Sequence, residues 1–167
     1  MEKPWLNSEA IKFLSKYILE NPNPKILEFG SGGSTIWFSQ KTPSLTTIEH
    51  NKLWFDYVNQ SLYKNKLCNP VDIRLIEQNY YKICDEFPDN FFDIILIDGI
   101  NRVNCAQASI RILKPGGILM LDNAERPWYH KIYSMLNNWK FYKTSQMRSD
   151  LSGKTSKLRE TNWWIKP

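Results

Sequence analysis

Three cysteines, two histidines and no long hydrophobic run set the first limits on this sequence of 167 residues. Cys68, Cys84 and Cys105 are odd in number and form no Cys-x-x-Cys pair, which excludes a disulfide framework and zinc-ligand spacing. No apolar stretch approaches the roughly 20 residues that cross a bilayer, and the first residues lack the apolar core of a signal peptide. We therefore expect a protein of the reducing cytoplasm that does not enter a membrane.

The composition is that of a globular chain, with 42% hydrophobic and 23% charged residues. Because no repeat or low-complexity linker interrupts it, we predict a single domain over residues 1–167. The net charge of +5 is unevenly placed, since residues 126–167 hold nine Lys/Arg against two Asp/Glu. This basic third would suit an acidic substrate or a nucleic acid, although scattered charges of this kind are also typical of a solvated surface.

Short β-branched runs alternate with helical patterns along the chain, which favours a mostly parallel sheet covered by helices. The predicted strands are 25–29, 45–49, 71–76, 92–97, 118–121, 140–147 and 158–165. The predicted helices are 8–20, a segment around 36–38, a segment from 51, a short 80–84, 104–113 and 127–137. A tight turn is expected at 114–117 and a polar loop at 149–156. The last two strands have no helix between them, so they are expected to pair antiparallel.

A glycine-rich turn follows the first predicted strand, in Glu28-Phe-Gly-Ser-Gly-Gly-Ser-Thr35. Gly30, Gly32 and Gly33 let the backbone turn sharply and approach a ligand closely. The dinucleotide pattern G-x-G-x-x-G would need glycine where Thr35 stands. Glu28 would repel a pyrophosphate, whereas it would attract the ammonium and sulfonium groups of S-adenosylmethionine. The turn therefore favours S-adenosylmethionine over NAD, FAD or a phosphate ligand.

Polar residues end the other predicted strands as well. Glu49 stands about 20 residues after the turn, which is the spacing expected for a carboxylate that accepts both ribose hydroxyls. His50 either packs near the adenine edge or is an exposed residue before a helix. Gln78 or Asn79 could hydrogen-bond the adenine amino group, and Asn79 is counted in the predicted cofactor site. Asp98 ends the central strand, where ligands of open parallel sheets bind and where a carboxylate is otherwise unfavourable.

Several motifs occur in an order that covers nearly the whole chain. They are Leu27-Glu-Phe-Gly-Ser-Gly-Gly33, Ile48-Glu49-His50, Phe92-Asp-Ile-Ile-Leu-Ile-Asp-Gly99, Leu113-Lys-Pro-Gly-Gly-Ile118 and the terminal hairpin. On these motifs the sequence resembles the class I S-adenosylmethionine-dependent methyltransferases. The resemblance implies an α/β, Rossmann-like fold: a seven-stranded, mostly parallel sheet with helices on both faces and a C-terminal antiparallel hairpin.

The resemblance also assigns residues to the cofactor. The turn that would hold its methionine end consists of Gly30, Ser31, Gly32, Gly33 and Ser34. Glu49 would bind the ribose, and Asp98 with Gly99 would form the rim of the active site. Ser34 stands where the family often has a third glycine, and its hydroxyl could serve the ligand carboxylate.

Asp98 and Arg102 are the predicted catalytic residues. We expect direct in-line transfer of the methyl group to an oxygen or nitrogen, mainly by proximity and orientation, with Asp98 as a possible base. Arg102 and Arg126 follow strand ends and could clamp a carboxylate or phosphate. Arg102 could equally be structural, pairing with Glu125 or a helix C-terminus. The residues that could roof the pocket are Trp5, Tyr80, Tyr81 and Trp128.

Asp98 with Asp122 and Asn123 is similar to the ligand set of the metal-dependent catechol-type O-methyltransferases, whose oxygen ligands suit Mg²⁺. The longer insertions of that family are absent, and Asp122-Asn123 could simply end a strand, so no metal is expected. The tetrapeptide of amino-methylating nucleic-acid enzymes is also absent, because Asp98-Gly-Ile-Asn101 stands there. A small molecule or glycan is therefore the expected methyl acceptor, and nucleic acid is possible but not favoured.

Three other functions compete with this interpretation. An aminopropyltransferase would need a further acidic site for a polyamine, which the basic C-terminal third disfavours. A nicotinamide-dependent oxidoreductase is disfavoured by Glu28 and Thr35. A non-catalytic methyltransferase-like subunit that binds RNA or protein remains open.

Overall fold

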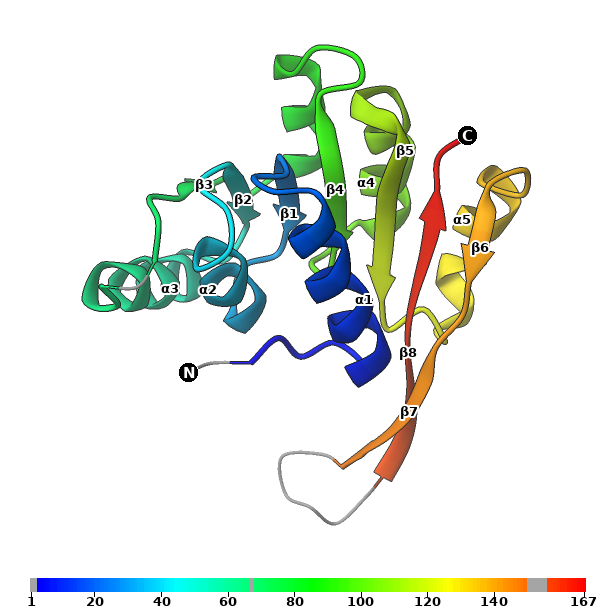
Figure 1. Ribbon diagram of the computed structural model, residues 1–167, viewed down its shortest axis with the longest axis horizontal. Coiled ribbons are helices and arrows are strands. Elements are labelled where there is room, and N and C mark those ends of the chain that lie inside the picture. The colour runs from blue at the N-terminus through cyan, green and yellow to red at the C-terminus, as the bar shows by residue number, and fades with distance from the viewer. Residues whose placement is uncertain (1–2, 67, 150–155) are drawn as a thin grey trace.

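In the part of the chain that the structure describes, eight strands form one sheet, and Figure 1 shows helices on both of its faces. The computed structural model describes residues 3–66, 68–149 and 156–167. Within them the strand order is β3-β2-β1-β4-β5-β8-β6, and β7 pairs with β8. The strands are β1 (Ile26–Phe29), β2 (Leu45–Glu49), β3 (Asp72–Leu75), β4 (Phe92–Ile97), β5 (Leu113–Asp122), β6 (Lys140–Tyr142), β7 (Ser145–Ser149) and β8 (Ser156–Ile165).

The predicted α/β sheet with an antiparallel end is confirmed. Strands β3, β2, β1, β4 and β5 pair in parallel, and β8 runs antiparallel to β5, β6 and β7. The strand predicted over 140–147 is two strands, because Thr144 turns its polar groups inward between them. Its N–H donates to Asn162 Oδ1 at 2.9 Å and its hydroxyl to Thr161 O at 2.6 Å. Most of the predicted loop 149–156 lies outside the described residues.

Helices fill the intervals between the strands, as the periodicity predicts. They are α1 (Ser8–Glu20), α2 (Gly33–Ser39), α3 (Lys52–Lys64), η1 (Tyr80–Glu86), α4 (Arg102–Ile112), η2 (Pro127–Tyr129) and α5 (His130–Met135), the η elements being 3₁₀ helices. Asn51 caps α3, since its side chain accepts a hydrogen bond from Trp54 N at 3.0 Å. Helix α4 begins two residues earlier than predicted, at Arg102.

The turn predicted at 114–117 is instead a bulge inside β5. The register between β4 and β5 pairs Phe92 with Leu113 and then Ile94 with Ile118. Gly116 takes a φ of 76° in the bulge. The C-terminal residues keep this stretch attached to the sheet, because Gly116 N donates to Lys166 O at 2.8 Å.

Alternate strand residues bury two separate cores. One core holds β-strand residues such as Leu27 and Ile95 against η1, α4 and α5. The other holds Ile26 and Ile94 against α1 and α2. Adjacent tryptophans in β8 divide between the two cores, because successive side chains of a strand point to opposite faces. Trp163 stacks on Phe13 of α1 at a centroid distance of 4.5 Å, and Trp164 packs edge-on against Tyr133 of α5 at 5.1 Å.

Two features of this fold determine where a ligand can bind. The strand order reverses between β1 and β4, so a crevice opens at their carboxyl ends. The hairpin of β7 with the first half of β8 extends beyond that edge (Figure 1) and meets the N-terminal segment. Asn7 joins the two, because its N–H donates to Thr161 Oγ1 at 3.0 Å and its amide to Arg159 O at 2.9 Å. Among the described helices, none has the length and apolar character needed to cross a bilayer.

Candidate functional site

The carboxyl ends of β1 and β4 touch through two glycines. Gly30 takes a φ of 95°, and a Cβ on it would lie 2.8 Å from the Cα and N of Gly99. A Cβ on Gly99 would in turn collide with the hydroxyl of Tyr80. Gly30 needs glycine for its left-handed conformation and its close backbone approach, and Gly99 needs it because a side chain would meet the Tyr80 hydroxyl and the backbone of Gly30. The backbone of the predicted ligand turn is therefore open to the crevice.

Glu28 lies beneath this turn and is fully buried. It accepts hydrogen bonds from the hydroxyls of Ser34, Thr35 and Thr47, the last two at 2.6 and 2.8 Å. Burial outweighs these bonds and raises the pKa of Glu28 to about 7. Thr35, which departs from the dinucleotide pattern, also accepts from Gly32 N at 2.8 Å and so joins the turn to the strand below it. Glu28 contacts the turn and does not line the cavity above it.

Glu49 at the end of β2 supports the turn from the other side. Its Oε2 accepts from the N–H and the hydroxyl of Ser31 at 2.9 and 2.8 Å. Its Oε1 accepts from the N–H groups of His50 and Asn51, each at 2.8 Å, and the His50 Nδ1 lies 3.0 Å away. The carboxylate is thus held in place by four donors, about as many as its lone pairs accept.

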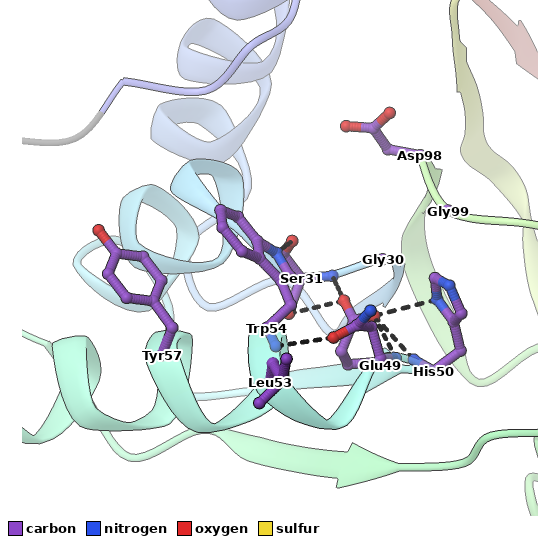
Figure 2. A pocket seen from close by; sticks show the side chains of 10 residues that line it. Gly30, Ser31, Glu49, His50, Leu53, Trp54, Tyr57, Asp98 and Gly99 are labelled. Atoms are coloured by element: carbon purple, nitrogen blue, oxygen red, sulfur yellow. Dashed lines mark hydrogen bonds and ion pairs between the residues drawn. The ribbon is translucent and has the colours of Figure 1, made fainter.

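An apolar wall faces these acids across a cavity of about 560 Å³. Figure 2 shows Trp54 and Tyr57 of α3 on one side of the opening, with Glu49 and His50 beside them and Asp98 across from them. The two rings stack at 5.2 Å, and Trp54 Nε1 donates to Ser31 O at 2.6 Å. The lining residues are Gly30, Ser31, Glu49, His50, Asn51, Leu53, Trp54, Tyr57, Asp98 and Gly99.

Asp98 lies where three cavities meet. It lines the first cavity, a second of about 430 Å³ over Gly32, Gly33 and Ser34, and a third of about 510 Å³ towards β5 and β8. Its side chain is 25% exposed. Burial, and next the neighbouring Asp122, raise the pKa of Asp98 to about 8. Asp98 is therefore a weak acid that faces the whole edge of the sheet.

Comparisons with known proteins agree with this geometry. No family model matches the chain, and no curated protein matches it by sequence. Among solved structures, a putative O-methyltransferase from Klebsiella pneumoniae has 20% identity and a TM-score of 0.73, with 99% of this chain and 84% of that chain covered. A precorrin-6y C5,15-methyltransferase from Geobacter metallireducens has 16% identity and a TM-score of 0.68, with 100% and 93% covered. A tRNA methyltransferase from Aquifex aeolicus has 13% identity and a TM-score of 0.69, with 100% and 72% covered.

The chain has the class I methyltransferase fold. At these identities the likeness establishes the fold and leaves the activity to the residues of the site. Within the methyltransferase fold, the structure brings most of the predicted cofactor residues together. Those that line the first or second cavity are Gly30, Ser31, Gly32, Gly33, Ser34, Glu49, His50, Asp98 and Gly99.

Arg102, predicted as catalytic or as a clamp, braces the crevice from below. Its side chain is 6% exposed. Its Nε donates to Gly99 O at 2.8 Å, its Nη1 to Asp122 O at 2.5 Å and its Nη2 to Asp98 O at 2.9 Å and Oδ1 at 3.2 Å. The guanidinium therefore joins the ends of β4 and β5. The predicted alternative partner was wrong, because Glu125 pairs with Arg159 at 2.9 Å.

Two other predicted contacts lie away from the first three cavities. Asn79 is exposed and takes a left-handed conformation before η1, where its side chain accepts from the Tyr81 hydroxyl at 3.4 Å. Tyr80, a predicted roof residue, is buried, and its hydroxyl bonds both to Ile100 N and to Ile100 O at 2.6 Å. It fixes the loop after β4. Trp5 fits its prediction better, since it is 63% exposed and lines the second and third cavities.

Most of the residues that line the first two cavities and that the sequence does not assign to the site lie on α3; the others are Asn51 and Lys3. Leu53, Trp54 and Tyr57 are predicted only as apolar helix residues, yet they are 82%, 42% and 51% exposed. Only Val58 of this helix is buried. The helix carries more large apolar residues than it can bury. This surplus is the sequence signal that could have identified a ligand-binding surface.

Asp98, Asp122 and Asn123 all line the third cavity of the methyltransferase fold. Asp122 Oδ1 accepts from Thr161 Oγ1 at 2.6 Å, and Asp98 pairs with Arg102. Within residues 3–66, 68–149 and 156–167, no group of three or more His, Cys, Asp or Glu side chains is arranged to hold a metal ion.

Proposed function

We propose that this chain binds S-adenosylmethionine in the first and second cavities and transfers its methyl group to an oxygen or nitrogen of a small molecule or glycan. The observation that carries the proposal is the lack of cationic side chains around the Gly30–Gly99 contact. Glu49 and Asp98 line the first cavity, and no Lys or Arg is among the described residues that line it, whereas Lys3 lines the second cavity, where a methionine carboxylate would lie. Such a cavity suits a cationic sulfonium nucleoside and disfavours a pyrophosphate.

The residues present fit this cofactor in shape and polarity. The cavity volume of about 560 Å³ lies within the range of small-molecule sites. Trp54, Tyr57 and Leu53 offer an apolar surface for the adenine ring, and the open backbone at Gly30 and Ser31 would meet the methionine end. Glu49 would accept the ribose hydroxyls. Since four donors already surround its carboxylate, the rotatable hydroxyl of Ser31 is the donor that would yield.

Bound S-adenosylmethionine would supply an electrophilic methyl group, and this chain would act by positioning the acceptor. Asp98 is the residue we place beside the reacting oxygen or nitrogen, since it lies between the proposed cofactor cavity and the third cavity. Burial makes its ionised carboxylate a stronger base, and that form would accept the proton of the nucleophile as the methyl group is transferred. We assign Arg102 to positioning, because its donors hold the carbonyls around Asp98.

Calorimetric titration with S-adenosylmethionine and S-adenosylhomocysteine tests the cofactor site. Glu49→Ala should weaken both affinities by about 100-fold, since two hydrogen bonds to a carboxylate are lost. Glu49→Gln keeps the shape of the side chain and should fall between the wild type and the alanine variant. Glu77→Ala removes an exposed carboxylate outside the cavities and is the matched control. An unchanged affinity in Glu49→Ala would contradict the proposed pocket.

Two organisational features belong to the same proposal. Residues 1–167 would form a single methyltransferase domain. The structure has free thiols at Cys68, Cys84 and Cys105, and these support the proposal that the protein functions in the reducing cytoplasm.

A further inference from the structure

The third cavity, on the far side of Asp98, is basic where the first is acidic. It is about 510 Å³ in volume and lies between the N-terminal segment, the loop after β5 and the β7–β8 hairpin. Its lining residues are Trp5, Asp98, Asp122, Asn123, Arg126, Arg148, Ser149, Lys157 and Arg159. Four of the nine Lys/Arg of residues 126–167 thus converge on one concave surface, although they are scattered in sequence.

The cations of this cavity differ in how far they are already neutralised. Arg159 pairs with Glu125 at 2.9 Å. Among the residues that the structure describes, Arg148 donates one side-chain hydrogen bond, to Trp5 O, which orients the guanidinium. Within the described residues, the side chains of Arg126 and Lys157 make no hydrogen bond or ion pair. Within the described part of the chain, Arg126, Arg148 and Lys157 therefore have no carboxylate at ion-pair distance, although Asp98 and Asp122 line the same cavity and interact electrostatically with Arg148.

The cavity also adjoins the place where we expect the reaction. Asp98 lines all three cavities, and Trp5 lines the second and the third. A molecule in the third cavity can therefore reach Asp98 while its other end contacts the cations. The exposed indole of Trp5 offers a flat apolar surface in the same cavity.

We propose that the methyl acceptor is a small molecule that carries an oxyanion, a phosphate or a carboxylate, bound by Arg126, Arg148 and Lys157 while its nucleophile lies at Asp98. That the bound anion is the methyl acceptor rests on the proposed function, whereas the presence of an anion site does not. Arginine side chains match oxyanions through paired donors. The cations surround one concavity, which suits a compact ligand, whereas a nucleic acid would need phosphate contacts along an extended surface.

The test is calorimetric titration of the full chain with inorganic phosphate, malonate and a single-stranded RNA dodecamer. Phosphate or malonate should bind to the wild type at concentrations up to about 10 mM. The double variant Arg126→Gln/Lys157→Gln should weaken that binding at least about tenfold, because two charge-assisted contacts are lost. Lys64→Gln, an equal charge change on the exposed end of α3, should leave it unchanged.

Either simple anion binding in this pattern supports the proposal, and the tighter of the two identifies the oxyanion. Absence of binding by both, or equal binding by the double variant, would overturn it. RNA that binds much more tightly than both anions and is lost in the double variant would also overturn it, in favour of a nucleic-acid acceptor. S-adenosylmethionine affinity, measured on the same variants, should not change. If the wild type fails to bind that cofactor but binds the anion, the proposed function fails and the anion site stands.

Discussion

The first and the third cavity are built in different ways, although Asp98 belongs to both. Residues 30–31, 49–57 and 98–99 form the first cavity, each within one strand-to-helix connection. The third draws on five separate parts of the chain, from Trp5 to Arg159. It is complete only when the N-terminal segment and the β7–β8 hairpin have docked on the sheet. The first cavity therefore needs only the parallel pairing of β1 with β2 and β4, whereas the third also needs the N-terminal segment and the hairpin in place.

The largest effect is expected beside the first cavity, where the residue after β1 contacts the loop after β4. Gly30→Ala would place a methyl group 2.8 Å from the backbone of Gly99 at a φ of 95°. We expect it to lower the free energy of unfolding by about 4 kcal/mol, from backbone strain and overpacking together, and to abolish cofactor binding. Gly116→Ala has a φ of 76° with nothing within 4 Å, so it should cost only about 1 kcal/mol. Urea denaturation measures both, and equal losses would show that the glycine contact is unimportant.

The next effect separates the acid beneath the first cavity from the exposed acids. The pKa of Glu28 is raised from 4.5 to about 7, so the folded state binds more protons than the unfolded state between these values. Its contribution to stability is present below pH 4.5 and is lost as pH rises through 7, by about 3 kcal/mol. In Glu28→Gln this loss should disappear, because the side chain cannot ionise. Glu9→Gln, on the exposed side of α1, should keep it.

Urea midpoints at pH 5 and pH 8 measure this difference. Asp98 and Asp122 also have raised pKa values and contribute a loss of the same sign to the wild type and both variants. An unchanged pH slope in Glu28→Gln would show that Glu28 does not carry the proton.

A smaller effect should disturb the third cavity and spare the first. Thr161 Oγ1 accepts from Asn7 N at 3.0 Å and donates to Asp122 Oδ1 at 2.6 Å, so it joins the N-terminal segment to the end of β5. Thr161→Val would leave both buried groups without this partner and should lower the free energy of unfolding by about 2 kcal/mol. Phosphate binding should weaken while cofactor affinity is retained. Thr46→Val, whose hydroxyl makes one exposed bond of 3.5 Å, is the control; a matching loss there would contradict the role of Thr161.

The sequence predicts the local region much better than the assembled one. The strands, the glycine turn, Glu49 and Asp98 all follow from periodicity and from short spacings, because their contacts lie within one or two elements. Arg102 shows the limit of prediction from periodicity and short spacings. An arginine after a strand is typical of an anion clamp, but its actual partners are the carbonyls of Asp98, Gly99 and Asp122, and the last of these is 20 residues away.

The basic C-terminal third of the chain shows the opposite error, because its residues look unrelated in sequence but lie together in the structure. Its charges look scattered because sequence spacing does not show that Arg126 and Lys157 face one cavity. The antiparallel register of β7 on β8 pairs Arg148 with Lys157, and both line the third cavity together with Arg126 of the loop after β5. Register within a hairpin depends on the turn and on side-chain packing, so composition alone could not predict this surface.

The smallest predicted effect tests the wall of the first cavity. Trp54→Phe keeps an aromatic ring in place but removes the donor that bonds Ser31 O at 2.6 Å. We expect S-adenosylhomocysteine to bind about fivefold more weakly in calorimetry, which corresponds to roughly 1 kcal/mol for one hydrogen bond that orders the turn. Trp128→Phe changes an indole that is 67% exposed and outside this cavity, so its affinity should equal that of the wild type. If both variants bind S-adenosylhomocysteine as tightly as the wild type, α3 contributes ring surface alone. A weaker affinity in Trp128→Phe would mean that the ligand does not bind in the first cavity.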